Sequence, residues 1–533
     1  MADLLVAGKI HTLEPGRLAA GALLARDGRI VRVGSLAECE REAARGARRI
    51  ALGAGSAVPG LVDAHGHVFH LSVARASVRC GGAASAEECA ARVTVRARTT
   101  PAGRWIRGRG WDQNRWPGRA FPGAALLTEA APHHPVVLVR VDGHAAWVNA
   151  AALEAAGIGE GTPDPPGGRI HRDAAGRPAG VLVDRAMDLV LARLPPPTPP
   201  EREEGILTAL RELAGLGLTG VHDAGVEPDG LDAYARLAEG GRLPIRVEAM
   251  IAGEPPLVAL EAELARWQGR RELGRLSVRA VKLYADGALG SRGAALLEPY
   301  ADEPGNTGLF LTPPEELRRK LALVVAAGFQ PAVHAIGDAA CREVLRAFVE
   351  AGPAARALRP RVEHLQLLDP SDRSLLASAR AIASMQPVHA TSDGPWLPAR
   401  LGEGRARLRG AYAWRSAAAA GGVLAFGSDF PIEEPDPRAG LHAAETRRSS
   451  DGTCFLPEEA LSRVEALRAF TAGAAFAAHA EGRRGVLREG LDADLTLFAE
   501  DVLAVPAEAL LRLTVTHTIV GGEVVFERVG GTG

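Results

Sequence analysis

Two histidines one residue apart end a short apolar segment near the start of the chain, Val58-Pro-Gly-Leu-Val-Asp-Ala-His-Gly-His67. In a β-strand, side chains two residues apart point to the same face, so His65 and His67 are placed to bind one metal ion together. The glycine between them removes bulk where a ligand must approach closely. The histidines stand at the C-terminal end of the segment, which in a closed parallel barrel is the end that carries active sites.

Residues with metal-binding or catalytic chemistry also follow later apolar segments. A single histidine in such a place is more often a satisfied core residue than a ligand, so their recurrence is the informative feature. They are Lys282 in Val281-Lys-Leu-Tyr, His334 in Ala332-Val-His, His364 in Glu363-His and Asp429 in Gly427-Ser-Asp. Imidazole and carboxylate ligands suit zinc and related divalent ions, so we expect a catalytic metal site with a position open for water.

Eight apolar segments have the length and composition of barrel strands. They are Val58–Val62, Leu218–His222, Ile245–Ile251, Val278–Tyr284, Gln330–His334, Arg361–Leu365, Ala381–Pro387 and Val423–Gly427. Strand and helix patterns alternate, which indicates an α/β fold with a parallel sheet, and eight such units predict a (β/α)8 TIM-like barrel. We place this barrel in residues 58–68 and 186–479.

The two ends of the chain read as short strands separated by turns, with a hairpin signal at Asp27-Gly28. Neither end has enough strands to be stable alone, so residues 1–57 and 480–533 are expected to pair into a composite β-sandwich with an antiparallel sheet. Residues 69–185 follow the first barrel strand and are too numerous for one crossover. This segment predicts an inserted subdomain that shapes a substrate pocket.

Composition narrows the class of protein. The chain has 533 residues, 47% hydrophobic residues and a net charge of −2, which favours a soluble protein with a small-molecule substrate over one that binds nucleic acid or a membrane. Its first residues lack a basic segment and a sustained apolar stretch, so we expect no signal peptide and a cytoplasmic location. The five cysteines include no C-x-x-C pair and are expected to be free thiols. A homodimer is compatible with this composition.

Lysine is rare in this chain. It occurs only at Lys9, Lys282 and Lys320, whereas arginine supplies the other basic residues. A buried lysine can lose its proton and act as an amine nucleophile, which arginine cannot. We therefore interpret Lys282, which lies in an apolar strand, as a residue needed for its amine chemistry. Chance retention of a lysine is the alternative.

The phrase Asp63-Ala-His-Gly-His, the strand lysine, the two single histidines and Gly427-Ser-Asp resemble the amidohydrolase superfamily of metal-dependent hydrolases. Closer phrases are similar to the amidohydrolase-3 branch, which includes N-substituted formamide deformylase-like proteins. These are Gly110-Trp-Asp-Gln-Asn-Arg-Trp, Arg140-Val-Asp-Gly-His-Ala, Lys282-Leu-Tyr-Ala-Asp-Gly-Ala-Leu-Gly-Ser-Arg-Gly and Val333-His-Ala-Ile-Gly-Asp. The resemblance covers essentially the whole chain.

The resemblance implies a ligand set for up to two metal ions, zinc first among the candidates. His65, His67 and Asp429 would bind the more buried ion, and His334 and His364 would bind the second. Lys282 would be carboxylated by carbon dioxide and would bridge the two ions, and Asp429 would pass a water proton to the leaving nitrogen. A mononuclear site is one alternative, and an unmodified Lys282 paired with Asp286 is another.

Four further residues are candidates for substrate binding. Trp111 and His144 are expected to line the pocket from the inserted segment, and Arg292 and Asp338 to orient the substrate or a metal ligand. A structural hydrogen-bonding role is the alternative for each.

The leading hypothesis is hydrolysis of a C–N bond in an amide, formamide or cyclic amide. Hydrolysis of an ester or carbamate by the same site, and a catalytically silent metal-binding ligand sensor, are the alternatives. A non-metal barrel that binds phosphate is disfavoured because no glycine-rich phosphate loop follows the seventh or eighth strand.

Overall fold

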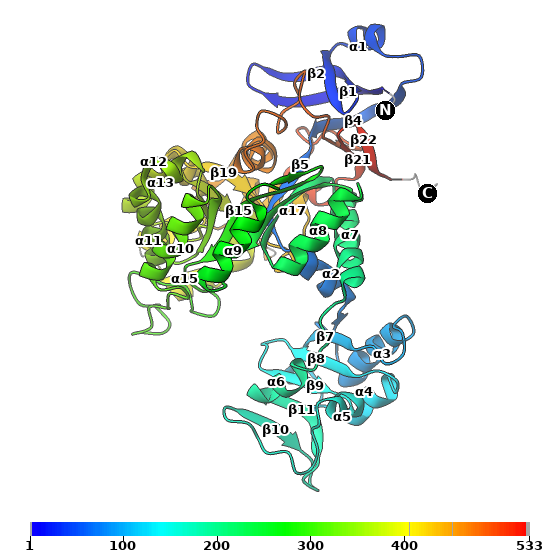
Figure 1. Cartoon of the computed structure of the whole chain (residues 1–533), viewed down its shortest axis with the longest axis vertical. Helices are drawn as coiled ribbons and strands as arrows, with labels where there is room; N and C mark the ends of the chain where they lie inside the picture. Colours follow the sequence, from blue (N-terminus) through cyan, green and yellow to red (C-terminus); the bar gives the residue numbers. More distant parts are fainter. Residues whose placement is uncertain (1–2, 404–405, 450, 529–533) are drawn as a thin grey trace. The chain divides into compact units, whose positions relative to one another are not determined.

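A computed structural model describes residues 3–403, 406–449 and 451–528 of the chain (Figure 1). The chain divides into two compact units, which we describe separately. The larger unit consists of Met1–His70 with Arg202–Gly533, and the smaller unit is Leu71–Glu201. The smaller unit overlaps the inserted segment predicted at residues 69–185 but extends further along the chain.

The larger unit contains a parallel sheet of eight strands that curves into a nearly closed barrel. Its hydrogen-bonded order is β5-β12-β13-β15-β16-β17-β18-β19, and each neighbouring pair is parallel. The strands are β5 (Leu61–Gly66), β12 (Leu218–Val226), β13 (Arg246–Ala252), β15 (Leu276–Tyr284), β16 (Gln330–Ala335), β17 (Arg361–His364), β18 (Ile382–Met385) and β19 (Val423–Phe426). A short strand, β14 (Glu272–Leu273), pairs antiparallel with β15. The predicted α/β fold with a TIM-like barrel is confirmed.

The first barrel strand lies further along the chain than predicted. Val58 and Pro59 end β4 (Arg48–Pro59), which belongs to another sheet, and β5 starts at Leu61. Gly60 lies between the two strands and donates its N–H to the Asp494 carbonyl oxygen at 2.9 Å. The apolar segment is continuous in sequence but changes sheets at this glycine. As a result, His65 lies within β5 and His67 directly follows it.

The strands β5 and β19 stand at opposite ends of the hydrogen-bonded order of this sheet. Hydrogen bonds join the segment after β19 to β5 and so bring these two ends together. The Asp429 N–H donates to the His65 carbonyl oxygen at 2.7 Å, and the His67 N–H donates to the Phe430 carbonyl oxygen at 2.9 Å. A Cβ atom at Gly427 would lie 2.5 Å from Asp63 Oδ1, so a side chain here would prevent the approach. The closure places Asp429 beside the two histidines of β5.

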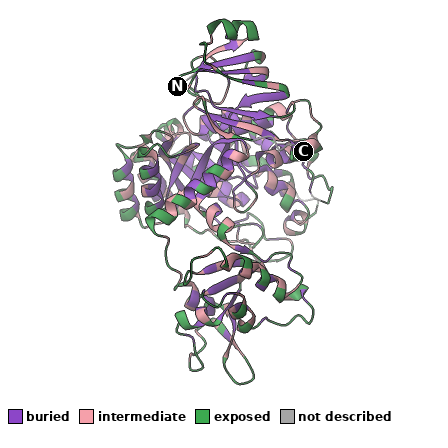
Figure 2. Cartoon of the chain, turned by 90° about the vertical axis from the view of Figure 1, so that its right-hand side faces the viewer, coloured by how far each residue is buried: buried purple, intermediate pink, exposed green. Residues whose placement is uncertain are grey.

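Helices alternate with the barrel strands, and their buried sides and exposed sides are distinct (Figure 2). The longer ones are α2 (Val68–Ala76), α7 (Pro199–Gly215), α8 (Pro228–Glu239), α9 (Leu257–Trp267), α10 (Pro314–Ala326), α11 (Asp338–Glu350) and α17 (Pro437–Thr446). Others are α12 (Gly352–Ala357), α13 (Arg373–Ala379), α14 (Pro387–Asp393), α15 (Leu397–Leu401), α16 (Trp414–Ala419), α18 (Arg463–Arg468) and α19 (Ala474–Ala477). Within the described ranges, no helix has the length and apolar character needed to cross a membrane.

Strands from both ends of the chain form a single seven-stranded sheet in the larger unit, with β1, β2, β4, β21 and β22 visible in Figure 1. Its order is β22-β21-β20-β4-β1-β2-β3. The strands not yet bounded are β1 (Leu4–Glu14), β2 (Arg17–Arg26), β3 (Arg29–Gly34), β20 (Leu495–Phe498), β21 (Val515–Val520) and β22 (Glu523–Glu527).

The pairing of β4 with β20 joins the N-terminal and C-terminal strands of this sheet, with Pro59 opposite Leu495. The β1–β4 pair is parallel, so the sheet is mixed rather than antiparallel as predicted. The hairpin predicted at Asp27-Gly28 is confirmed, because both residues have positive φ between the paired strands β2 and β3. The composite β-sandwich stays a prediction.

The smaller unit has its own six-stranded sheet and its own core. The strands occur in the order β10 (Gly168–Arg172), β11 (Pro178–Asp184), β9 (Ala145–Val148), β8 (Val136–Arg140), β7 (Ile106–Trp111) and β6 (Val78–Arg79). The helices are α3 (Ala86–Ala97), α4 (Ala124–Ala130), α5 (Ala150–Ala155) and α6 (Asp188–Leu191). Trp111, Trp116 and Trp147 pack together in its main hydrophobic cluster.

Candidate metal centre

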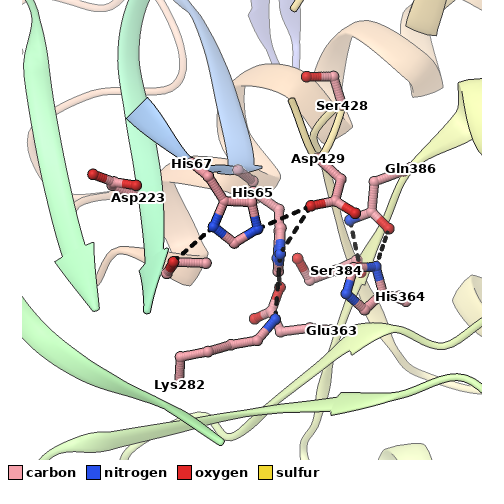
Figure 3. A network of polar contacts seen from close by, with 12 residues as sticks. His65, His67, Asp223, Lys282, Glu363, His364, Ser384, Gln386, Ser428 and Asp429 are labelled. Atoms are coloured by element: carbon pink, nitrogen blue, oxygen red, sulfur yellow. Dashed lines mark hydrogen bonds and ion pairs between the residues drawn. The ribbon is translucent and has the colours of Figure 1, made fainter. Parts of the chain in front are cut away.

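His65, His67 and Asp429 converge at the C-terminal end of the barrel (Figure 3). Nε2 of His67 lies 3.1 Å from Asp429 Oδ1, and Nε2 of His65 lies 3.7 Å from the same oxygen. The ligand atoms of the three residues all lie within 4.8 Å of one another. His65 and His67 thus face the same carboxylate oxygen, and their binding of one metal ion stays a prediction.

The other predicted ligands continue this cluster across neighbouring strands. Lys282 on β15 places its Nζ 3.3 Å from His65 Nε2. The ring of His364, at the end of β17, lies 4.7 Å from that of His65 and 4.6 Å from that of His334 on β16, measured between centroids. The barrel topology therefore brings all six predicted ligand residues into one polar cluster.

Hydrogen bonds on the outer side of three rings determine which nitrogen faces the cluster. Nδ1 of His65 lies 2.5 Å from Glu363 Oε2, Nδ1 of His67 lies 2.9 Å from the Ala224 carbonyl oxygen, and Nδ1 of His364 lies 2.8 Å from Gln386 Oε1. Each partner is an acceptor, so each Nδ1 carries the proton and donates it. In the neutral form of each ring the lone pair is then on Nε2, which faces inward, and this is the arrangement by which proteins orient imidazole ligands.

A buried arginine holds the partner of His65 in place. Arg361 donates from Nε to Glu363 Oε1 at 2.6 Å, and it also bonds the Ala64 carbonyl oxygen and Ser384. Burial acts to raise the pKa of Glu363, but Arg361 and His65 outweigh it and hold that pKa well below the usual value. Glu363 is therefore a carboxylate, able to accept the Nδ1 proton of His65.

The buried bases of the cluster are shifted toward their neutral forms. Burial, together with the nearby Lys282 charge, lowers the pKa of His65 to about 4 and that of His334 to about 3. Burial also lowers the pKa of Lys282 to about 8. Neutral imidazoles and a readily deprotonated amine are the states in which these side chains offer lone pairs.

Two imidazole nitrogens in this region have a carboxylate oxygen nearby but make no hydrogen bond to any described residue. Nε2 of His334 lies 3.7 Å from Asp286 Oδ1, and Nε2 of His389 lies 3.9 Å from Asp429 Oδ2. Both nitrogens are buried. His389, on α14, was not among the predicted site residues, nor were Glu363, Arg361 and Gln386. The polar residues Ser384 and Gln386 at the end of the seventh barrel strand repeat the pattern seen at the other strand ends, and that pattern was the available signal for this strand.

Backbone geometry also distinguishes the cluster. His364 has φ of 74° and Asp429 has φ of 59°, a region that non-glycine residues rarely adopt and that is frequent at functional sites. Gly66 plays a different part from the one predicted. A Cβ atom at Gly66 would lie 2.2 Å from the Phe430 ring, so the glycine accommodates that ring rather than an approaching ligand.

The alternative pairing of Lys282 with Asp286 has no support in this structure. Asp286 accepts three backbone N–H bonds of 2.8–3.0 Å, from Ala295, Ile336 and Gly337. Among the described residues no ion pair joins it to Lys282. Asp286 therefore fixes the loop after β15 against the end of β16.

Arg292 and Asp338 also have structural partners. Arg292 donates to the Asp302 carboxylate at 3.0 and 3.2 Å within its own loop. Asp338 begins α11 and accepts the Leu297 N–H at 2.8 Å and the Ala339 N–H at 3.0 Å. These contacts match the structural alternative given for both residues.

The two candidates in the smaller unit differ from each other. Trp111 is 0% exposed, donates its indole N–H to the Leu138 carbonyl oxygen at 2.7 Å and has no surface for a substrate, so its assignment to a substrate pocket is wrong. His144 is exposed, and its Nδ1 lies 2.9 Å from Asp184 Oδ1. This difference could not be predicted from the sequence, because both residues occur in similar polar, glycine-containing phrases.

The burial of Trp111 leads to a prediction about stability. Truncation to alanine would leave a cavity among Trp116 and Trp147, and such Trp→Ala changes cost about 3–5 kcal/mol. We expect Trp111→Ala to lower the free energy of unfolding of the smaller unit by that amount, measured by urea titration of the full chain. Trp111→Phe should recover part of the loss. Wild-type stability together with weaker substrate binding would restore the pocket assignment.

Comparisons with known proteins agree with the fold. The family model described as the amidohydrolase family matches residues 49–526. Putative amidohydrolase YtcJ of Bacillus subtilis is 33% identical over 532 residues, covering 98% of each chain. The N-substituted formamide deformylase of Arthrobacter pascens is 27% identical over 553 residues, covering 99% of each. A crystal structure of an uncharacterized metal-dependent hydrolase from Pyrococcus horikoshii superposes with a TM-score of 0.81 at 27% identity, covering 95% of this chain and 99% of that one.

These matches extend over nearly the whole chain and include both units. The chain belongs to the amidohydrolase family, and it is a hydrolase acting on carbon–nitrogen bonds.

Proposed function

We propose that this protein is a metal-dependent hydrolase that cleaves the C–N bond of a small amide, formamide or cyclic amide. The observation that carries the proposal is the convergence of His65, His67 and Asp429. Because Nδ1 of His67 donates to a carbonyl oxygen, its Nε2 is the nitrogen that faces the Asp429 carboxylate, at 3.1 Å. A proton on Nε2 makes a hydrogen bond at this distance, and a metal ion held by both side chains would take the place of that proton.

The donor set fits a divalent ion, with zinc the first candidate, since imidazole nitrogen and carboxylate oxygen are ligands that zinc prefers. His65, His67 and Asp429 would hold one ion, and His334 and His364 would serve a second. The buried and unpaired Nε2 of His334 supports its inclusion. When bound, such an ion supplies Lewis acidity, which makes water more acidic and a carbonyl carbon more electrophilic.

Lys282 is proposed to carry a carboxyl group. Its amine reacts with carbon dioxide only when neutral, forming a carbamate and releasing one proton. A pKa of about 8 leaves about a tenth of the amine neutral at pH 7, far more than an ordinary lysine would provide. The resulting carboxylate would serve as a metal ligand, as the side chain of Asp or Glu does in other metal sites, and it would lie near His65.

Asp429 is proposed as the group that moves the proton. Burial acts to raise its pKa, but the hydrogen bond with His67 and the nearby imidazole groups outweigh burial and hold the pKa well below the usual value. As a carboxylate, Asp429 can take a proton from the attacking water and pass it to the leaving nitrogen. The water oxygen bonds to the carbonyl carbon, the C–N bond breaks, and an acid and an amine are released.

The experiment that tests the function uses the purified full-length protein. Its metal content is measured, the metal is removed by chelation, and zinc is returned in steps. Release of amine is followed for N-formyl amines, N-acyl amines and cyclic amides, and release of alcohol is followed for matched esters. We expect amine release that rises with metal content. Cleavage of esters alone, or no turnover by a fully loaded protein, would contradict the proposal.

A prediction concerns the Glu363 carboxylate, which positions His65. Glu363→Gln keeps the size of the side chain but replaces the carboxylate that accepts the hydrogen bond from His65 Nδ1 with a neutral amide. Loss of such an outer contact costs about 10–100-fold in metal affinity. We expect that loss in a competition titration with a chelator. Glu272→Gln is the matched control, because Glu272 pairs with Arg279 at an exposed position of the same barrel. Equal metal affinity in both variants would contradict the positioning role.

A further inference from the structure

We propose that His389 donates a hydrogen bond from Nε2 to the carbonyl oxygen of the substrate, and that Gln366 holds His389 in the tautomer that allows it. This inference rests on the proposed function, because it names the group that contacts the carbonyl in that reaction. It also restricts the substrate class to compounds whose scissile bond adjoins a carbonyl oxygen.

The burial of His389 is the first observation. The residue is 7% exposed, and its Nε2 has no hydrogen-bond partner within the described part of the chain. Asp429 Oδ2 lies 3.9 Å away, which is longer than a hydrogen bond. A buried ring nitrogen without a hydrogen bond is unfavourable, so this nitrogen is available to a partner that arrives with the substrate.

The second observation is the polarity of the ring. Nδ1 of His389 lies 3.3 Å from the Gln366 side-chain nitrogen, which carries only donor hydrogens. Nδ1 must therefore accept, and the proton of the neutral ring is on Nε2. This is the opposite of His65, His67 and His364, whose Nδ1 atoms all face acceptors.

The position of Gln366 is itself fixed. Its side chain is 5% exposed, and its backbone carbonyl oxygen accepts the Tyr412 N–H at 2.7 Å. Gln366 is two residues beyond His364, in the segment that leaves β17. In this segment, His364 presents its Nε2 as an acceptor to the cluster. Gln366, two residues later, fixes the tautomer in which Nε2 of His389 is a donor.

A metal-binding role for His389 is the competing explanation. His364, His389 and Asp429 each offer a possible ligand atom, and these atoms lie within 4.8 Å of one another. A ligand needs a lone pair on the inward nitrogen, however, and the contact with Gln366 places a proton there. The two explanations predict opposite results for metal content.

The geometry also indicates where the carbonyl would lie. Asp429 Oδ1 faces His65 and His67, whereas Oδ2 faces His389, so the carboxylate lies between the imidazole pair and the donor. An N–H at this place can hold the carbonyl oxygen and stabilise the negative charge that develops on it as water adds. Amidines and aminotriazines, which lack this oxygen, would not use the donor.

The test compares two variants of the full-length, metal-loaded protein. His389→Leu removes the donor at similar bulk, and His389→Gln retains an N–H near the position of Nε2. Three quantities are measured: metal content, hydrolysis of the best substrate, and calorimetric binding of acetohydroxamate, a small probe with a carbonyl oxygen. We expect His389→Leu to keep its metal, to lose about 10²–10³-fold in kcat/KM and to bind the probe at least about tenfold more weakly. His389→Gln should recover most of both losses.

The outcomes separate this proposal from its alternatives. Loss of metal in His389→Leu would overturn it in favour of a ligand role. Full activity in His389→Leu, or equal losses in both variants, would overturn the donor role. If the wild-type protein hydrolyses no amide, the proposed function fails, but probe binding still tests His389 by itself. Unchanged binding of the probe in His389→Leu would then refute the inference.

Discussion

Replacement of His65 or His67 by alanine is expected to remove metal from the cluster and to lower turnover by more than about 10²-fold, since even loss of an outer contact costs 10–100-fold. Both Nε2 atoms face Asp429 Oδ1, so neither histidine can replace the other. The measurements are elemental analysis of the purified variants and amine release from the best substrate. Both variants should be affected to a similar degree.

His70→Ala is the matched control for these variants. The His70 ring lies 5.8 Å from that of His67, one turn into α2, and belongs to neither group of candidate ligands. We expect this variant to retain its metal and most of its activity. A double variant of His65 and His67 with full metal content would refute the assignment of both residues.

Much of the fold follows from the sequence because its determinants are local. The strands from Leu218–Val226 to Val423–Phe426 are apolar segments bounded by turns, and parallel pairing requires the helices between them. The first strand was misplaced at Val58, because an apolar segment that is continuous in sequence gives no sign of a change of sheet. That change depends on the pairing of Pro59 with Leu495, far along the chain.

The inner residues of the site were predictable for a related reason. His65, Lys282, His334, His364 and Asp429 stand at the C-terminal ends of strands, and barrel closure brings such ends together whatever the loops contain. Positions of this kind follow from strand order alone. The sequence therefore identified these residues before any side-chain contact was known.

The residues that orient this cluster could not be predicted in the same way. Arg361 and Glu363 are buried charges whose partners come from β5 and β18, and only tertiary structure pairs them. Trp111 was misassigned because burial in a separate core cannot be read from a tryptophan-rich segment. His389 was missed because it lies in a short helix after the seventh strand rather than at the strand end.

The remaining prediction concerns Lys282, whose role depends on a chemical modification. If the side chain is a carbamate, Lys282→Ala should lose at least one metal ion and about 10²–10³-fold or more in turnover. Lys282→Arg should be equally inactive, because a guanidinium cannot be carboxylated and would repel a metal ion. Metal analysis and amine release measure both effects. A short acid such as acetate or formate should restore part of the activity of Lys282→Ala by supplying the missing carboxylate.

Lys320→Ala separates this chemistry from the general effect of removing a buried lysine. Lys320 donates to the Gly253 and Glu254 carbonyl oxygens, so its loss should reduce stability while metal content is retained. Reloading of metal-free protein should depend on bicarbonate for the wild type and not for Lys282→Ala. The dependence should weaken as pH rises through 8, because the neutral amine then predominates and reacts at lower carbon dioxide. A bare Lys282 amine in a protein that has both metals bound would show that no carbamate is needed, and the metal cluster would then rest on the histidines and Asp429 alone.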